Sequence, residues 1–562
     1  MTLDDPPIDP GPTSDLVGPL RAAYGLSYTA AQLVHRAGRA PGDETERWLD
    51  PKLAHLTPPT DMAGRAPAAE RIASAIRRKE RICVFGDYDC DGITATAVMT
   101  SAIRALGGEA VPLLATRTEG AYGLSAPALA RVRASGAGLV VTCDCGSSDH
   151  ERIDEARRAG VDTIVIDHHL VPKETLPAFA FLNPHRPECG FSFKHLASCG
   201  LALTMAAALR QELKAQLDLR PLLDLVAIGT IADVVPLVGD NRALTRAGLR
   251  VLASGARPGL RALAGLAKVD LAAGVGGEDV AYRIAPRINA PGRLGDPDEA
   301  LALLLSRDRT TAEGLAASIE QTQLRRRAVQ AQMVEEAMAD VAERGMAELG
   351  GLVLAREAWH PGVVGIVAGK VAETTLKPTI VIAIEGSTGR GSVRGPRGFP
   401  LYDALVQCRG ELVGFGGHQA AAGVHVRADR IDALRSAWAD ACATISAGRT
   451  FEKLGEPTAR LDPRDEPAMV LRDLERLEPF GEQNPTPALL CAGAIVRSAR
   501  DLKGHLKLEL GVGERTLTSV AFGRAELLPA VTGQVVDAVG FLRRNTFAGG
   551  AELHVQKISR PR

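Results

Sequence analysis

The feature that most constrains this chain is an apolar run that ends in closely spaced acids. The run Ile82 to Phe85 is followed by a helix-like stretch of small residues from Thr94, and between them stand three alternate acids, Asp87, Asp89 and Asp91. This order predicts a strand, an acidic loop and a helix. Because neighbouring carboxylates repel each other strongly in a low dielectric, they need cations, and Mg²⁺ or Mn²⁺ suits oxygen ligands. Taken alone, the same residues would also fit a solvated acidic turn of the Asx or EF-hand kind.

Three later stretches carry further acids and two histidines. Two apolar runs end in Asp144 and in the triplet Asp167, His168 and His169, and a third apolar stretch contains Asp233. If these stretches are successive strands of one parallel sheet, their side chains meet at its carboxyl edge, where α/β enzymes build their sites. A single pair of histidines could be a surface accident, but four such stretches in this order predict a metal centre.

These four stretches resemble the four motifs of the DHH phosphoesterase superfamily, whose members hydrolyse phosphodiesters or pyrophosphate with two Mn²⁺ or Mg²⁺ ions. Within the superfamily the chain is similar to the RecJ family of 5′-to-3′ exonucleases specific for single-stranded DNA. Further stretches carry that similarity through almost the whole chain: 117–123, 286–295, 359–367, 414–418 and 477–485. The resemblance implies a two-metal nuclease that releases 5′-mononucleotides in DNA recombination and repair.

The resemblance also implies a role for each residue of the metal centre. Asp144 is expected to bridge the ions, and the full expected ligand set is Asp87, Asp89, Asp91, Asp144, His168 and Asp233. Asp87 would either bind an ion directly or hydrogen-bond a ligand. His169 is expected to face the scissile phosphate, with Asp167 orienting both imidazoles. Many relatives have a histidine where this chain has Phe85, so one ion is expected to hold fewer protein ligands and more water.

Substrate contacts follow from the same resemblance. A pocket for the 5′-terminal phosphate would be formed by Arg117, Arg287, Ser392 and Arg394, and bidentate arginine contacts suit such an anion. The contacts expected further along the strand and around phosphates near the metals are Asn289, Arg293, His360, Gly416, Gly417 and His418. The segment 389–397 is richer in Pro and Arg than the form common in the family, which leaves the details of the pocket open.

The expected fold class is α/β, with two α/β lobes joined by a long helix and followed by a C-terminal OB-like β-barrel. A length of 562 residues exceeds what one hydrophobic core supports. Alternating strand-like and helical stretches predict the parallel sheet, and short alternating runs near the C-terminus predict the barrel. The expected divisions are a tail and helical lead-in (1–79), a DHH catalytic domain (80–309), a connecting helix (310–349), a DHHA1 domain (350–450) and an OB-fold domain (456–562).

Some local expectations are more specific. The first 15 or so residues are rich in Asp and Pro and are expected to form a loose tail, and the helical lead-in is expected to pack against the catalytic sheet. The stretch 283–295 is expected to be a loop between helices. Residues 310–349 contain almost no Gly or Pro, which favours one long helix over a hairpin of two helices broken near Arg327.

Composition limits the class of protein. A net charge of −1 is unusual for a nucleic-acid binder, so any basic surface must be local and metal ions must supply part of the positive field. Nine cysteines without paired CxxC spacing indicate a reducing cytoplasm and no zinc site. Neither a membrane span nor a signal peptide is found. The expected partners are single-stranded DNA, with a single-strand-binding protein and a helicase as candidate protein partners, and no membrane.

Two other functions fit fewer of these residues. DHH/DHHA1 phosphodiesterases that act on oligoribonucleotides or cyclic dinucleotides usually lack the C-terminal barrel and the 286–295 stretch. A catalytically inactive DHH protein that only binds nucleic acid would not need all of the acids and both histidines. In the barrel, the candidate rings for stacking on bases are Phe522, Phe541 and Phe547.

Overall fold

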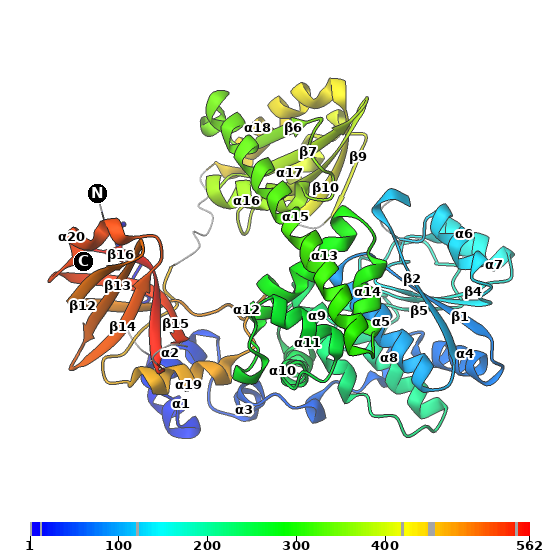
Figure 1. Ribbon diagram of the computed structural model, residues 1–562, viewed down its shortest axis with the longest axis horizontal. Coiled ribbons are helices and arrows are strands. Elements are labelled where there is room, and N and C mark those ends of the chain that lie inside the picture. Colours follow the sequence, from blue (N-terminus) through cyan, green and yellow to red (C-terminus); the bar gives the residue numbers. More distant parts are fainter. Residues whose placement is uncertain are drawn as a thin grey trace.

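The structure is a computed structural model that describes residues 3–11, 14–119, 123–417, 421–447, 456–545 and 549–561. Its sheets lie in three bodies: the expected catalytic body (81–305), a second α/β body above it (352–446) and a barrel beside it (459–559) (Figure 1). None of the described helices combines the length and apolar character that a membrane crossing requires. The predicted fold class is confirmed.

The first sheet is parallel and buried on both faces. Its strands are β1 (Arg81–Gly86), β2 (Glu109–Leu114), β3 (Leu139–Cys143), β4 (Asp162–Ile166) and β5 (Ala180–Leu182), in the spatial order β2-β1-β3-β4-β5. Alternate residues of β1 face opposite ways, so that Ile82 and Val84 join one core while Cys83 and Phe85 join another. The first core is covered by α4 (Arg65–Arg77), α5 (Cys90–Ala105) and α8 (Ser198–Glu212), and the second by α6 (Ala126–Ala134) and α7 (His150–Arg158).

A helical region follows the sheet, and two local expectations about it are wrong. It comprises α9 (Leu223–Ala232), α10 (Gly239–Ala253), α11 (Pro258–Leu266), α12 (Gly277–Asp279), a π-helical turn (Val280–Ile284), α13 (Ala285–Leu294) and α14 (Asp298–Leu305). Asp233 therefore follows a helix rather than a strand, and the stretch 283–295 is mostly helical rather than a loop. Pro286 lies just after the π-helical turn, and the helical run continues through it as α13.

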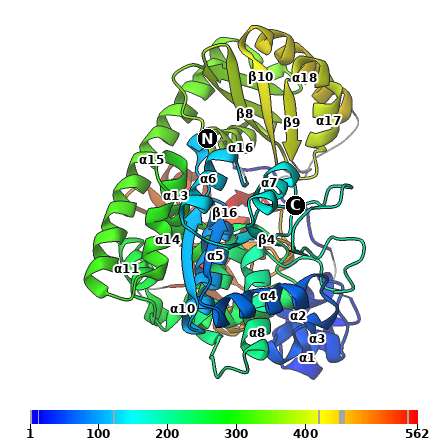
Figure 2. The same ribbon diagram turned by 90° about the vertical axis from the view of Figure 1, so that its right-hand side faces the viewer.

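One unbroken helix, α15 (Arg309–Glu343), joins the catalytic body to the second α/β body and runs along one side of the molecule (Figure 2). The predicted long helix is confirmed, and the hairpin broken near Arg327 is excluded. The second sheet contains β6 (Leu352–Arg356), β7 (Thr379–Glu385), β8 (Thr388–Arg394), β9 (Gly414–Gly417) and β10 (Ala421–Arg427), in the order β6-β7-β8-β10-β9. Its helices are α16 (Val364–Thr375), α17 (Leu401–Gln407) and α18 (Ile431–Ser446).

The C-terminal body is a closed barrel. Its elements are β11 (Ala459–Arg460), α19 (Pro467–Leu477), β12 (Leu489–Leu502), β13 (His505–Val512), β14 (Arg515–Ala521), α20 (Leu528–Val531), β15 (Val535–Arg544) and β16 (Ala551–Ser559). The strands follow the order β12-β13-β14-β16-β15, and pairing of β12 with β15 closes the ring. Closure leaves these strands without an open edge, as expected for the predicted OB-like barrel.

The N-terminal helices pack against the barrel, which corrects the expectation that they cover the catalytic sheet. Helices α1 (Val17–Tyr24), α2 (Tyr28–Arg36) and α3 (Asp43–Leu49) share one hydrophobic core with the barrel strands, whereas α4 belongs to the catalytic core. The described part of the tail is also docked: the Asp4 backbone N–H donates to the Ile558 carbonyl at 2.9 Å, and the Asp4 carboxylate accepts from the Ile558 N–H at 2.8 Å. An apolar helix face does not specify its partner, so the sequence could not distinguish the two cores.

A buried arginine joins this combined N- and C-terminal body to the catalytic body. The Arg242 side chain on α10 is 1% exposed, and its Nε donates to the Trp48 carbonyl at 2.9 Å while its Nη2 donates to the Leu477 carbonyl at 2.8 Å. The guanidinium also lies 4.6 Å from the centroid of the Trp48 ring. Burial lowers the pKa of Arg242 to about 9. Leu477 ends α19, so the cation meets the negative end of a helix as well as individual carbonyl oxygens.

Replacing Arg242 by methionine should destabilise the docking of these bodies. The substitution leaves buried carbonyls without donors, and hydrogen bonds to a charged group are each worth about 1.5–3 kcal/mol, so we expect a loss of about 3 kcal/mol. Urea unfolding measures the loss of stability, and limited proteolysis between residues 477 and 489 measures the loss of docking. Arg220→Met, at an exposed arginine already paired with Asp218, is the matched control and should leave both readouts unchanged. An unchanged urea midpoint in Arg242→Met would contradict this role.

Candidate active site

The acidic loop after β1 is held by its own backbone. Asp89 is the N-cap of α5, and its Oδ1 accepts hydrogen bonds from the backbone N–H groups of Asp91 at 3.0 Å and Gly92 at 3.1 Å. A Cβ atom at Gly92 would lie 2.6 Å from the Asp87 carbonyl oxygen, so only glycine lets the loop fold back onto the helix. The alternating acids are therefore a helix start, with Asp91 inside the first turn and buried.

The N-terminus of α8 supports two of the acids. The backbone N–H groups of Ser198 and Cys199 donate to the two oxygens of Asp91 at 2.7 and 2.9 Å, and the Ser198 hydroxyl donates to Asp144 Oδ1 at 2.8 Å. Asp144 follows β3 with a left-handed backbone (φ 64°). Neither Ser198 nor Cys199 was recognised from the sequence as part of the site, because nothing in the sequence shows that the start of α8 faces these acids.

His168 is the point where the acids meet. Its Nε2 lies 3.4 Å from Asp144 Oδ1, 3.3 Å from Asp233 Oδ2 and 4.0 Å from Asp91 Oδ2. Three sets of possible ligand atoms lie within 4.8 Å of one another: Asp144, His168 and His169; Asp91, His168 and Asp233; and Asp87, Asp89 and Asp144. All six expected ligand residues are thus brought together, and they form overlapping sets that share Asp144 and His168.

Burial makes this cluster electrostatically unfavourable without cations. Burial raises the pKa of Asp91 to about 6, although bonds from Cys199 and Ser198 oppose the shift. The pKa values of Asp87, Asp144 and Asp233 are raised well above the usual range by burial first and then by neighbouring carboxylates. Asp87 Oδ1 is buried without a hydrogen bond from the described part of the chain. Buried oxygen ligands that repel one another fit hard divalent cations such as Mn²⁺ and Mg²⁺.

His169 is oriented by Asp167. The His169 Nδ1 lies 2.7 Å from Asp167 Oδ1, and the same oxygen accepts from the backbone N–H groups of His168 at 2.8 Å and His169 at 3.2 Å. Burial lowers the pKa of His169, but the bond and charge of Asp167 outweigh it and raise the pKa to about 9. Asp167 is held by Ser147, whose N–H donates to Oδ2 at 3.0 Å. Like Ser198 and Cys199, Ser147 is a residue of the site that the sequence interpretation did not identify.

The expected phosphate-binding residues are distributed between the catalytic body and the second α/β body. On β8, Arg394 Nη1 donates to Ser392 Oγ at 2.8 Å, and both side chains lie beside Gly365 at the start of α16. Arg117 donates to the Gly292 carbonyl at 3.0 Å and stacks over the Tyr88 ring at 4.1 Å. These three groups remain the residues expected to form the 5′-phosphate pocket.

Other expected contacts have partners inside the protein. Arg287 Nε and Nη2 bind both oxygens of Glu320 on α15 at 2.5 and 2.9 Å, so its charge is already neutralised. Arg293 is half-buried, and its Nη1 donates to the Gly362 carbonyl at 3.2 Å. The Gly362 N–H in turn donates to Nδ1 of the neighbouring His360 at 3.1 Å. Asn289 lines a groove between α13 and the segment 480–486. Gly416 and Gly417 end β9, and His418 lies outside the described residues.

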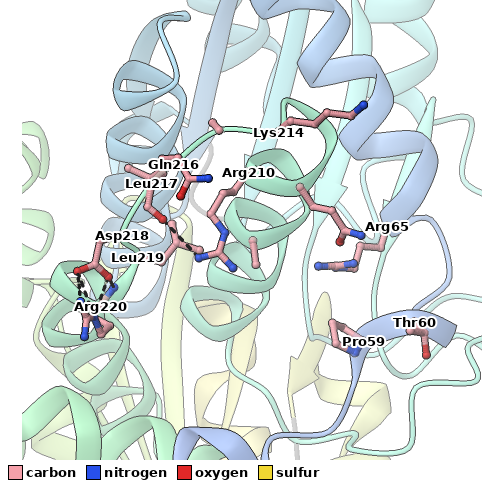
Figure 3. Close-up of a pocket in the computed structure, with 13 residues that line it drawn as sticks. Pro59, Thr60, Arg65, Arg210, Lys214, Gln216, Leu217, Asp218, Leu219 and Arg220 are labelled. Carbon is pink, nitrogen blue, oxygen red and sulfur yellow. Dashed lines mark hydrogen bonds and ion pairs between the residues drawn. The ribbon is translucent and has the colours of Figure 1, made fainter.

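A separate cavity of about 1110 Å³ lies away from the acidic cluster, beside the end of α8 (Figure 3). Its lining carries Arg65, Arg210 and Lys214, while Asp218 is paired with Arg220 at its rim. Because its lining contains one acid and no histidine, this cavity does not offer a metal-binding donor set.

Comparison with known families matches three parts of the chain. Residues 81–230 match the DHH family, N-terminal domain; residues 348–444 match the DHHA1 domain; and residues 459–557 match the RecJ OB domain. The chain is 34% identical over 540 residues to the single-stranded-DNA-specific exonuclease RecJ of Bacillus subtilis. The alignment covers 95% of this chain and 68% of the relative.

Solved structures agree with the sequence comparison. The crystal structure of RecJ from Thermus thermophilus in complex with Mn²⁺ superposes with a TM-score of 0.82 at 30% identity, covering 98% of this chain and 78% of that one. The structure of the same Thermus protein with Mg²⁺ gives a TM-score of 0.76 at 29% identity, with 98% and 77% covered. The likeness therefore spans the catalytic body, the second α/β body and the barrel. This chain belongs to the RecJ family of DHH proteins.

Proposed function

We propose that this protein is a metal-dependent exonuclease that degrades single-stranded DNA from the 5′ end and releases 5′-mononucleotides. The observation that carries the proposal is the buried cluster of acids around His168, set in a chain that resembles RecJ exonucleases along almost its whole length. The physiological setting we propose is recombination and repair of DNA in the cytoplasm, with a single-strand-binding protein and a helicase as partners.

Mn²⁺ or Mg²⁺ would be held by Asp89, Asp91, Asp144, His168 and Asp233, with Asp87 beside them. When bound, two such ions polarise the scissile phosphate and acidify a water molecule. The protein contributes rigid positions for these ligands: the α8 backbone fixes Asp91, and Ser198 fixes Asp144. The fit rests on the chemistry of the donor set and on the mutual repulsion of its carboxylates.

His169 would act on the substrate rather than on the acids. Since Asp167 accepts the hydrogen bond from Nδ1, the other ring nitrogen, Nε2, is the atom left to meet a phosphate oxygen. With its pKa raised to about 9, the imidazole carries a proton at neutral pH and can donate it in a charged hydrogen bond. The role of Asp167 is to hold the ring in that orientation and to stabilise its positive charge.

The 5′ end would be recognised by Arg117, Ser392 and Arg394, which come from both α/β bodies. A terminal phosphate held there fixes which phosphodiester lies over the acids, so the pocket acts as a ruler. We propose a supporting role for Arg287, which would position α13 through Glu320, in place of direct contact with the phosphate. Arg293, Asn289, His360 and the Gly416–Gly417 strand end would line the path of the DNA.

Asp144→Asn should stabilise the metal-free protein and weaken its binding of Mn²⁺. A carboxyl whose folded pKa lies above its unfolded value of 3.8 makes stability fall as pH rises from that value, and burial and neighbouring carboxylates raise the folded pKa of Asp144 well above it. The variant should therefore lose less stability between pH 4 and pH 8 than the parent. Thermal unfolding in EDTA, repeated after Mn²⁺ addition, measures both effects.

The control for Asp144 is Asp154→Asn, which removes a half-buried acid paired with Arg157 and Arg158 and should leave the Mn²⁺ response intact. Hydrolysis of single-stranded DNA by Asp144→Asn should fall by several orders of magnitude. Parental activity at saturating Mn²⁺ would rule out the assignment of Asp144 as a shared ligand.

Arg394→Ala should reduce kcat/KM on 5′-phosphorylated single strands roughly tenfold, because a charged hydrogen bond is worth about 1.5–3 kcal/mol. The substrates to compare are 5′-phosphorylated, 5′-hydroxyl and circular strands and a dinucleotide. Arg390→Ala, an exposed arginine on the same strand, is the matched control. Rapid cleavage of the circle or dinucleotide, with indifference to the 5′ phosphate, would favour a phosphodiesterase of oligoribonucleotides or cyclic dinucleotides.

Phe522→Ala should weaken binding of long single strands while leaving hydrolysis of short ones unchanged. Phe522 is 55% exposed on the barrel between the rings of His505 and His554, each with its centroid 5.3 Å away, whereas Phe541 is partly buried and Phe547 lies outside the described residues. Stacking on one base is worth about 1–3 kcal/mol, so affinity should fall about tenfold. Fluorescence anisotropy measures the affinity for DNA, with Ile495→Ala, at a similarly exposed aliphatic residue, as the control. Equal losses of affinity in the two variants would exclude stacking.

A further inference from the structure

Asn183 stands directly after β5, beside the residues that follow β4. The two strands are parallel, with Ile166 opposite Leu182, and the Asp167 N–H donates to the Leu182 carbonyl at 3.0 Å. This register places Asn183 next to Asp167 at the carboxyl edge of the sheet. The Asn183 side chain is fully buried, so its amide must find its partners within the protein.

The Asn183 amide links the ends of three strands. Its Nδ2 donates to the His169 carbonyl at 2.8 Å and to Ser147 Oγ at 3.2 Å, and its Oδ1 accepts from the His185 N–H at 2.9 Å. Ser147 follows β3 and in turn donates its N–H to Asp167. The network therefore ties the segment after β3 to the segment after β4 through a residue after β5.

His169 is fixed at two points by this network. Asp167 holds its ring through Nδ1, and Asn183 holds its backbone carbonyl. Immediately beyond it the chain turns outward, since Leu170 is 67% exposed. Without the Asn183 bond, the backbone of His169 would be tethered from one side only, while the ligands around His168 would keep their own contacts.

We propose that Asn183 is a positioning residue that holds His169 where it can meet the scissile phosphate, and that it does so without contributing to metal binding. This inference rests on the proposed function of the site. In this arrangement Asn183 acts through the His169 backbone and through Ser147.

The test combines kinetics with a double-mutant cycle. Asn183→Ala should lower kcat on single-stranded DNA about 10- to 100-fold, since small displacements of a positioned group have effects of that order, while KM and Mn²⁺ affinity stay within about threefold of the parent. In a His169→Ala background, Asn183→Ala should lower kcat no further, because the residue through which it acts is gone. Mn²⁺ affinity is measured by electron paramagnetic resonance of the free ion.

Two further variants separate positioning from general stability. Asn183→Asp keeps the acceptor for His185 but removes both donated bonds, so it should reproduce the loss in kcat. Asn484→Ala is the matched control, because its amide also donates to two carbonyls, those of Leu477 and Pro479, but lies at the junction with the barrel. It should lower the unfolding temperature without affecting kcat on short strands.

A readout without substrate keeps the inference distinct from the proposed function. In spectra of metal-free protein labelled with ¹⁵N-histidine, the His169 ring N–H bonded to Asp167 should shift or broaden in Asn183→Ala and stay unchanged in Asn484→Ala. If the parent fails to degrade single-stranded DNA, the proposed function falls, whereas the spectra still decide the role of Asn183. The positioning role of Asn183 would be overturned by any of three results: an unchanged His169 ring signal in Asn183→Ala, an equal loss of kcat in the His169→Ala background, or a large loss of Mn²⁺ affinity.

Discussion

Repulsion among buried carboxylates is the constraint on which the catalytic body depends. Asp91, Asp144 and Asp233 all approach His168 within 4.0 Å, in surroundings that favour their protonated forms. The fold offsets part of this cost with the N-terminus of α8, whose N–H groups and Ser198 hydroxyl point at two of the acids. A helix N-terminus carries about half a positive charge, so it cannot neutralise several carboxylates. Divalent cations suit the remainder.

The second requirement of the site is that helices pack very close to the acids. This requirement explains why some nearby positions are glycines. A Cβ atom at Gly229 on α9 would lie 2.8 Å from Asp91 Oδ1 and 2.6 Å from the Cys199 sulfur, so only glycine lets α9 pass this close to Asp91 and the start of α8. Gly292 does the same for α13 against the carbonyl of Tyr88. Because Arg287 holds α13 to α15, the acidic loop is linked through α13 to the helix that leads to the second α/β body.

The features that could be predicted from the sequence are those that local patterns decide. The strand before Asp87, the triplet after β4 and the length of α15 follow from apolar periodicity and from residues adjacent in the chain. Asp233 shows the limit: its position near His168 could be inferred from family resemblance, but the apolar stretch before it suits a buried helix as well as a buried strand. The roles of Ser198 and Asn183 depend on which strand ends and helix starts lie side by side, and that is a property of the tertiary fold.

The barrel is more closely tied to the acids than its place at the end of the chain suggests. The connection from α9 to α10 carries Asp233, and at Leu237 its backbone N–H donates to the Glu482 carbonyl at 2.9 Å in the segment that leads into the barrel. Arg242, a few residues further on, holds the end of α19. Since α1 to α3 share the barrel core, removing the C-terminal body would also expose the N-terminal helices and release this clamp. A truncation there would therefore perturb the Asp233 segment as well as the proposed DNA-binding surface, whereas a single substitution such as Phe522→Ala leaves the clamp in place.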